Sequence, residues 1–238
     1  MKGILLIALV SMVLASAGYA QKKFQEDILK TSGGDLKITF IGHGTLMLTY
    51  AGKVIHVDPV SMYADYTTLP KADLILVTHE HGDHMDRNAI QAISTPNTVL
   101  VVNPGSAAVL VNGTVLKNGD TKTISGIYIE AVPAYNLEKP FHPKGNGNGY
   151  ILTLGDKRIY IAGDTENVPE IKSLKNIDVA FLPMNLPYTM TPEQVADVAK
   201  SIKPKVLYPY HFGDTDAKRV AELLKGEKTI EVRIRDMR

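Results

Sequence analysis

The sequence predicts an α/β fold in which helices cover β-sheets, and three observations support this prediction. From Asp35 onward, short runs rich in β-branched and aromatic residues alternate with segments of helical pattern. No low-complexity or linker-like stretch divides the chain. The 238 residues, 45% of them hydrophobic, suffice for one domain with a large buried core.

The strands are predicted from short apolar or alternating runs bounded by turn residues. The second run is long enough for two strands and folds into a hairpin at Ala51, Gly52 and Lys53. The predicted strand segments are 36–43, 45–59, 73–79, 98–102, 122–134, 149–164, 179–183, 205–211 and 229–234.

One helix is predicted by its boundary residues. Thr191 and Gln194 form a capping-box pattern, and Pro192 suits the first helical position. Pro204 ends the run. The apolar residues that share one face of this helix are Val195, Val198 and Ile202.

Three further helices are predicted with less distinct ends. One runs over about 215–225, with Gly226 as its C-terminal cap. Two shorter helices cover 86–93 and 169–174. Helices that follow strand ends leave the loops at those ends free to carry functional residues.

The first twenty residues have the pattern of a secretory signal peptide. A basic start precedes an uncharged apolar stretch, and the small residues Gly18 and Ala20 suit cleavage before Gln21. We therefore expect a signal peptide over 1–20, a single domain over 21–238, and an exported protein, periplasmic or secreted. An earlier cleavage site and an uncleaved membrane anchor stay open as alternatives.

Composition excludes several classes of partner and site. The formal net charge of +1 and the 21% of charged residues give no polyanion-binding surface, so we expect a small-molecule substrate and no nucleic acid. The chain has no cysteine, which excludes disulfides, lipid attachment to an N-terminal cysteine and thiolate metal ligands. The oligomeric state is left open.

The motif "THEHGDH" follows an apolar strand and holds three of the seven histidines. In extended backbone, side chains two apart point to the same side, so His79, His81 and Asp83 can converge. Asp83 and the adjacent His84 cannot easily face one cation together. The spacing therefore suggests two neighbouring metal sites, one with His79 and His81 and one with Asp83 and His84. The competing interpretation is a polar surface loop.

Further candidate ligands follow later apolar runs. Asp164 stands in "GDT" after one predicted strand, and His211 stands in "YHFG" after another. Each residue alone is weak evidence for a metal site, since aspartates are common in turns and a lone histidine is more often structural. Together with the histidine motif they indicate a rim of metal ligands at strand ends.

With these motifs in place, the chain resembles the metallo-β-lactamase superfamily of metal-dependent hydrolases. Its His-x-His-x-Asp-His motif is matched by "HEHGDH" at 79–84. The branch that includes ascorbate-6-phosphate lactonase and the phospholipase D acting on N-acyl phosphatidylethanolamine is similar in "GHGT" at 42–45 and in Asp58-Pro59. The resemblance extends over about 37–211.

The resemblance implies a four-layer αββα sandwich with metals at one edge of the two sheets. It also implies that Asp164 bridges two ions and that Asp83, His84 and His211 complete the second site. The expected cofactor is one or two divalent ions, zinc first, with manganese or iron as alternatives.

The chain departs from the family pattern at the third histidine of the first site. Asn136 stands about where that histidine is expected, and amide oxygen is a poorer zinc ligand than imidazole. His142 could loop back to complete a two-metal site; otherwise the first site binds weakly, or only the second is filled. Tyr135 and Asn136 are candidate substrate contacts.

Two other residues are candidates around the metals. His43, at a strand end between two glycines, is a possible substrate or metal contact or a plain turn residue. Asp58 is expected to accept the second ring N–H of a metal-binding histidine, or else simply to form a turn before proline.

The expected function is an exported hydrolase that uses a metal-bound hydroxide on an ester, lactone, amide or phosphodiester bond. Asp83 is the candidate catalytic residue, as a ligand that also orients the nucleophile or moves its proton. The alternatives are a non-catalytic metal- or ligand-binding protein, a β-lactamase and a mononuclear iron oxygenase. Specificity is expected in the loops 61–70, 137–149 and 184–190, whose aromatic residues suggest a partly apolar cleft.

Overall fold

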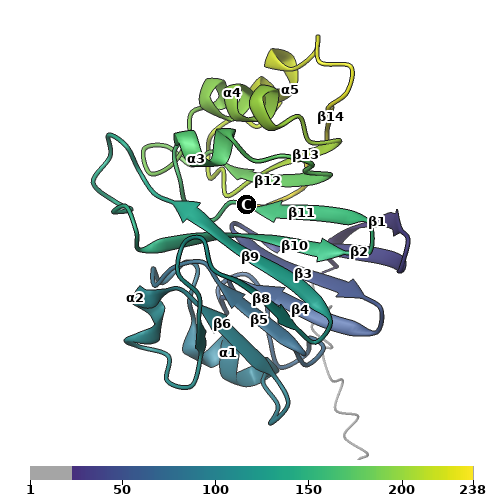
Figure 1. Ribbon diagram of the computed structural model, residues 1–238, viewed down its shortest axis with the longest axis vertical. Helices are drawn as coiled ribbons and strands as arrows, with labels where there is room; N and C mark the ends of the chain where they lie inside the picture. The colour runs from purple at the N-terminus through teal and green to yellow at the C-terminus, as the bar shows by residue number, and fades with distance from the viewer. Residues whose placement is uncertain (1–22, 238) are drawn as a thin grey trace, which may run out of the picture.

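The computed structural model describes residues 23–237, which form two seven-stranded sheets (Figure 1). The predicted signal peptide lies outside the described residues. Within 23–237 no helix is long and apolar enough to cross a bilayer. The first sheet contains, in order, β1 (Gln25–Thr31), β2 (Gly34–Gly42), β3 (Thr45–Tyr50), β4 (Lys53–Val57), β5 (Leu74–Val77), β6 (Val99–Val102) and β7 (Thr114–Val115). The second contains β14 (Glu231–Val232), β13 (Val206–Tyr210), β12 (Val179–Pro183), β11 (Lys157–Ile161), β10 (Gly147–Leu154), β9 (Ile127–Ala134) and β8 (Thr121–Ile124).

The helices cover the two outer faces of the sheet pair. Figure 1 shows α1 (Arg87–Ile93) and α2 (Pro104–Ala107) beside β5 and β6. At the opposite end, α3 (Pro169–Lys172), α4 (Pro192–Ile202) and α5 (Lys218–Leu223) lie beside β12 and β13. The expected four-layer αββα sandwich is confirmed.

Alternating side chains divide the core between the layers. On β5, Leu74 and Leu76 join the large cluster between the sheets, whereas Ile75 and Val77 pack toward α1. A strand that is buried on both faces needs apolar residues at every position. This explains why "LILV" does not alternate between apolar and polar residues. The motif at 79–84 therefore begins at the end of a strand that is fixed from both sides.

The predicted elements with the clearest boundary residues are confirmed. Helix α4 has Thr191 as N-cap with both hydrogen bonds of the capping box to Gln194. The hairpin between β3 and β4 turns at Ala51 and Gly52, both with positive φ, as two-residue hairpin turns require.

Other elements differ from the prediction. The helix expected over 215–225 is shorter, at Lys218–Leu223, and its C-cap is Leu224 rather than Gly226. Strand β1 was not predicted, because it is an edge strand with a mostly exposed, charged sequence. Its Asp27 accepts hydrogen bonds from Tyr208 and Arg235, so polar contacts hold it where apolar packing does not.

The topology collects strand ends at one edge. Strands β4, β5 and β6 are parallel, and so are β11, β12 and β13. Parallel strands end at the same edge of a sheet. Two backbone hydrogen bonds join the sheets there, from Asn148 to Thr78 at 2.9 Å and from His211 to His43 at 3.0 Å. This edge holds the candidate site.

Candidate metal centre

Six of the seven histidines converge at this edge, together with Asp83 and Asp164. His56 is the exception: it is buried in β4 and its Nε2 lies 3.0 Å from the carbonyl oxygen of Pro70. The converging side chains form two groups joined by Asp164. The first group is His79, His81 and His142, and the second group is Asp83, His84 and His211.

The first group combines a strand end with a loop. His79 and His81 follow β5, whereas His142 comes from the loop between β9 and β10. The candidate ligand atoms of the three rings lie within 4.8 Å of one another, and His79 Nε2 is 3.1 Å from His81 Nδ1. The structure thus brings His142 to this pair.

Asn136 lies behind His142 and supports it. Its side-chain oxygen accepts hydrogen bonds from the His142 backbone N–H at 3.0 Å and from His142 Nδ1 at 2.7 Å. Its backbone N–H donates to the His142 carbonyl at 2.8 Å, and its side-chain amide donates to the Tyr188 carbonyl at 3.1 Å. With the proton on Nδ1, the lone pair of His142 Nε2 is free for a cation.

The second group is built around Asp83, whose side chain is 44% exposed. His211 Nε2 lies 3.5 Å and His84 Nε2 lies 3.9 Å from Asp83 Oδ2. His43 stands beside them, with Nε2 3.2 Å from Asp83 Oδ2 and its ring centroid 3.7 Å from that of His211. His43 therefore lies on the rim as the sequence suggested.

Asp164 lies between the two groups, and its side chain is buried. Its Oδ1 is 3.4 Å from both His84 Nε2 and His211 Nε2. Its Oδ2 is 3.3 Å from His142 Nε2. One carboxylate thus presents an oxygen to each group.

Buried partners fix the rings that point into the centre. Asp58 accepts hydrogen bonds from His84 Nδ1 at 2.8 Å and from the backbone N–H and hydroxyl of Thr78, both at 2.7 Å. The Thr78 hydroxyl oxygen in turn accepts from His79 Nδ1 at 3.0 Å. One aspartate therefore sets the tautomer of His84 directly and that of His79 through Thr78. The sequence indicated Asp58 for this place but gave no signal for Thr78.

The pKa values differ between the two groups. Burial lowers the pKa of His79 well below its usual value, and the nearby His84 lowers it further. Burial also lowers the pKa of His81. Burial alone would lower the pKa of His84, but the carboxylates of Asp164 and Asp58 outweigh it and hold that pKa well above its usual value. Cation binding by His84 is therefore coupled to release of a proton, whereas His79 and His81 are already neutral.

The two aspartates stay ionised despite burial. Burial raises the pKa of the Asp164 carboxyl, but the imidazoles of His211 and His84 outweigh it, so the pKa lies well below its usual range. Hydrogen bonds from His211 and His43 likewise outweigh burial and hold the pKa of Asp83 far below its usual range. Both carboxylates are thus available as ligands.

The backbone is unusual around the second group. His43, Asp58 and His211 all have positive φ, at 54°, 46° and 46°, a conformation that costs energy for residues other than glycine and is often found at functional sites. Gly44 passes so close that an added Cβ would lie 2.7 Å from His84 Cε1. Glycine is therefore required at Gly44 to let the backbone approach the rings.

The donor set fits a divalent cation. His84 Nε2, His142 Nε2, His211 Nε2 and Asp164 Oδ1 are buried and have no hydrogen-bond partner within the described chain. Such atoms are costly unless a ligand or water satisfies them. Ligand atoms around a tetrahedral zinc ion lie roughly 3.3 Å apart, given Zn–N distances near 2.0–2.1 Å, and the separations between neighbouring ligand atoms described above are 3.1 to 3.9 Å. Imidazole and carboxylate are also the ligands that zinc takes.

Tyr135 does not lie in the centre, which corrects the expectation of a substrate contact there. The side chain is only 4% exposed and its hydroxyl donates to Glu170 at 2.8 Å. Asn136 is corrected as well, because its oxygen is engaged by His142 rather than directed at a cation. The β9 strand ends just before these residues, and the chain turns away before it returns at His142.

A cleft of about 380 Å³ opens onto the centre. Its floor consists of centre residues, including Asp83, Asp164 and His142, and its walls add Tyr63, Phe141, Asn185 and Tyr188. These walls come from the three loops in which specificity was expected.

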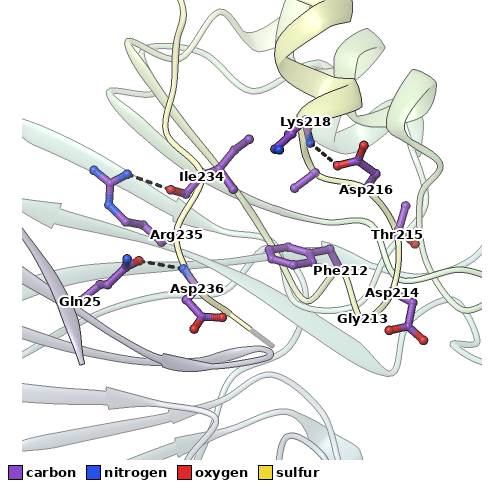
Figure 2. A pocket seen from close by; sticks show the side chains of 11 residues that line it. Gln25, Phe212, Gly213, Asp214, Thr215, Asp216, Lys218, Ile234, Arg235 and Asp236 are labelled. Carbon is purple, nitrogen blue, oxygen red and sulfur yellow. Dashed lines mark hydrogen bonds between the residues drawn. The ribbon is translucent and has the colours of Figure 1, made fainter. Parts of the chain in front are cut away.

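A second hollow, of about 590 Å³, lies between the loop before α5 and the C-terminal segment (Figure 2). Figure 2 shows that the Gln25 side chain accepts a hydrogen bond from the backbone N–H of Asp236, and that Asp216 accepts one from the backbone N–H of Lys218. None of the ligand groups found within 23–237 lies there, so the smaller cleft is the candidate active site.

Comparison with known proteins agrees with this geometry. Residues 37–211 match the family model described as a beta-lactamase superfamily domain. A relative from Geobacillus, named UPF0173 metal-dependent hydrolase, is 32% identical over 74% of this chain and 85% of its own length.

Solved structures extend the comparison. A candidate metal-dependent hydrolase from Parabacteroides distasonis superposes with a TM-score of 0.88 at 55% identity, over 91% of this chain and 100% of that one. The metallo-beta-lactamase fold protein YhfI from Bacillus subtilis has a TM-score of 0.68 at 15% identity, over 85% of this chain and 96% of that one, and shows the fold alone. The chain belongs to the metallo-β-lactamase superfamily of metal-dependent hydrolases.

Proposed function

We propose that the centre holds two adjacent divalent cations, zinc first, and hydrolyses an ester, lactone, amide or phosphodiester bond. The observation that carries this proposal is the position of Asp164, with one oxygen toward each group. Bound cations would act as Lewis acids and lower the pKa of water to about 7, which makes hydroxide available at neutral pH.

Asp83 is the residue best placed to handle the proton of the attacking water. Its side chain is the more exposed of the two central aspartates, and it lies on the cleft floor. His43 donates to Asp83 Oδ2 and so fixes the position of that oxygen. The remaining carboxylate oxygen is free to orient water and to receive its proton.

His142 weakens the case for a non-catalytic protein. That alternative rested on the missing third histidine of the first group. His142 supplies an imidazole within 4.8 Å of the ligand atoms of His79 and His81, so the feature that suggested a degraded site has a replacement. The export of the protein is proposed from the sequence of residues 1–20 only.

The test is turnover by protein reconstituted with zinc, manganese or iron on a panel of esters, lactones, amides and phosphodiesters. We expect hydrolysis by the parent and loss of at least about a hundredfold in His79→Ala and Asp83→Asn, with metal content measured in parallel. Asp214→Asn, an exposed aspartate of the second hollow, serves as the control and should keep parental activity. A parent that retains metal but hydrolyses nothing would support the binding-protein alternative.

Two cheaper assays address the remaining alternatives. Nitrocefin turnover would identify β-lactam cleavage. Oxygen consumption that requires iron would identify an oxygenase, whereas the proposed hydrolysis proceeds equally without oxygen. The location is tested by fractionation of cells that express the full chain, where a mature protein starting at Gln21 outside the cytoplasm is expected.

A further inference from the structure

The cleft walls differ in chemistry from the floor. Every wall residue that is not part of the metal centre is uncharged: Tyr63, Phe141, Asn185 and Tyr188. None of the residues that line the cleft in the described chain is a lysine or arginine. The two acidic residues of the floor, Asp83 and Asp164, belong to the candidate metal centre.

The lysines of the neighbouring loop are engaged elsewhere. Lys139 Nζ lies 3.1 Å from Glu166 Oε1 and also contacts the Thr189 carbonyl. Lys144 Nζ lies 2.9 Å from Glu170 Oε1. A phosphate or carboxylate on the substrate, remote from the cations, would therefore find no lysine or arginine partner on these walls.

Aromatic rings form two separate parts of the wall. Phe141 and Tyr188 pack edge to face, with ring centroids 4.9 Å apart, and are 36% and 43% exposed. Tyr63 stacks on His43 at 5.4 Å. Burial and the Asp83 carboxylate raise the pKa of Tyr63 to about 12, so its phenol is neutral. The Phe141–Tyr188 pair stands by the first group, and Tyr63 stands by the second.

The three loops that supply the walls also carry exposed apolar residues. Met62, Leu137 and Leu186 are 83%, 55% and 43% exposed and belong to the same three loops. Large apolar side chains exposed together around a cleft are typical of binding sites.

From this cleft we infer that the substrate is a neutral carbonyl compound, an ester, lactone or amide, whose remote group is aliphatic or aromatic and packs on Phe141 and Tyr188. The inference rests on the proposed hydrolytic function and narrows its substrate class. In the reaction, the water oxygen bonds to the carbonyl carbon, the C–O or C–N bond breaks, and the leaving oxygen or nitrogen receives a proton. Substrates with a remote phosphate or carboxylate are disfavoured.

The first experiment measures binding without turnover. Hydroxamates bind metal centres through one end, so hexanohydroxamic acid, butyrohydroxamic acid and adipic monohydroxamic acid differ only in what enters the cleft. Calorimetry on zinc-loaded protein should show about fifteenfold tighter binding of the six-carbon than the four-carbon chain, from two buried methylenes. The ω-carboxylate should weaken binding at least about tenfold.

The second experiment measures turnover of the matched methyl esters by pH-stat: methyl hexanoate, methyl butyrate and monomethyl adipate. The same order in kcat/KM is expected. Phe141→Ala and Tyr188→Ala should reduce the chain-length ratio below about fivefold. Tyr128→Ala, which removes an aromatic ring of similar exposure (41%) on β9, should keep the parental ratio.

The outcomes separate the two proposals. Equal or better binding and turnover of the ω-carboxylates would overturn the substrate class while hydrolysis stands. Preference for hexanohydroxamate with no hydrolysis of these esters or of any lactone, amide or phosphodiester in the panel would overturn the proposed function and keep the apolar specificity of the cleft. Unchanged ratios in both cleft variants would overturn the role of Phe141 and Tyr188.

Discussion

The two halves of the metal centre are held in different ways. The second group stands on strand ends: His84 follows β5 and is bonded to the fully buried Asp58, and His211 follows β13. The first group has one member, His142, on a loop that returns after β9. Strand ends therefore position the whole second group, whereas the first group also depends on the polar contacts of a loop.

The loop that carries His142 is fixed by a small set of hydrogen bonds. Asn136 makes the contacts described above, and Glu80, inside the histidine motif, accepts from Asn146 at 2.5 Å and from Asn103 at 3.1 Å. Thus Glu80 points away from the metal ligands but connects their strand end to the far end of the loop.

The largest effect is expected where the two halves meet. Asp164→Asn exchanges the carboxylate shared by both groups for an amide, which is a poorer ligand and carries no charge. We expect both cations to bind more weakly and kcat/KM to fall by about a thousandfold or more. Elemental analysis and kinetics of refolded, zinc-loaded protein check this, and a variant with two ions and parental activity would contradict the shared role.

A change confined to the second group should have the next largest effect. In Gly44→Ala, the new Cβ meets His84 Cε1 at 2.7 Å and His211 Cδ2 at 3.3 Å, so both rings must move. We expect about a hundredfold loss of activity and weaker binding of one cation. Gly82→Ala is the matched control inside the motif, because an added Cβ there meets nothing within 4 Å. Equal behaviour of the two variants would show that the close approach at Gly44 is unimportant.

A change confined to the first group should be milder. Asn136→Ala removes the acceptor for His142 Nδ1 and leaves the imidazole free to rotate. Loss of such a supporting partner costs about ten- to a hundredfold in metal affinity, and we expect the lower end because the backbone bond between Asn136 and His142 remains. Competition titration with a chelator should show weakening of one cation only. Weakening of both would mean that the halves are not independent.

The smallest effect is expected in the pH dependence of cation affinity, which should differ between the two groups. The pKa of His84 is held above its usual value, so a cation at the second group competes with a proton and its affinity should rise with pH from about 6.5 upward, by up to about tenfold per unit. The pKa values of His79 and His81 are lowered, so these ligands are already deprotonated there and add no such dependence. Two binding constants with the same pH slope would contradict this difference.

The sequence predicted what local pattern determines. The capping box of α4, the hairpin at Ala51 and the alignment of the 79–84 motif at a strand end follow from short-range rules, and the structure has each of them. The place of Asp58 beside a ring nitrogen could also be expected, since such histidines need an acceptor for their other nitrogen.

The rest depends on contacts distant in sequence. The hydrogen bonds that Asn136 makes across the loop bring His142 back to the centre. Residue spacing alone could not decide whether the first site was complete, weak or empty. The need for glycine at Gly44 arises from His84 and His211, far along the chain. Strand β1 has little apolar pattern because ion pairs with the C-terminal segment replace packing.

The most direct test of the central claim is the number of zinc ions bound per chain, measured by elemental analysis after equilibrium dialysis. The parent should hold two, His142→Ala should hold one, and Asp164→Asn should hold fewer than two at the same free zinc. A parent with a single ion, or a His142→Ala variant that still holds two with unchanged affinity, would contradict a two-cation centre completed by this loop histidine.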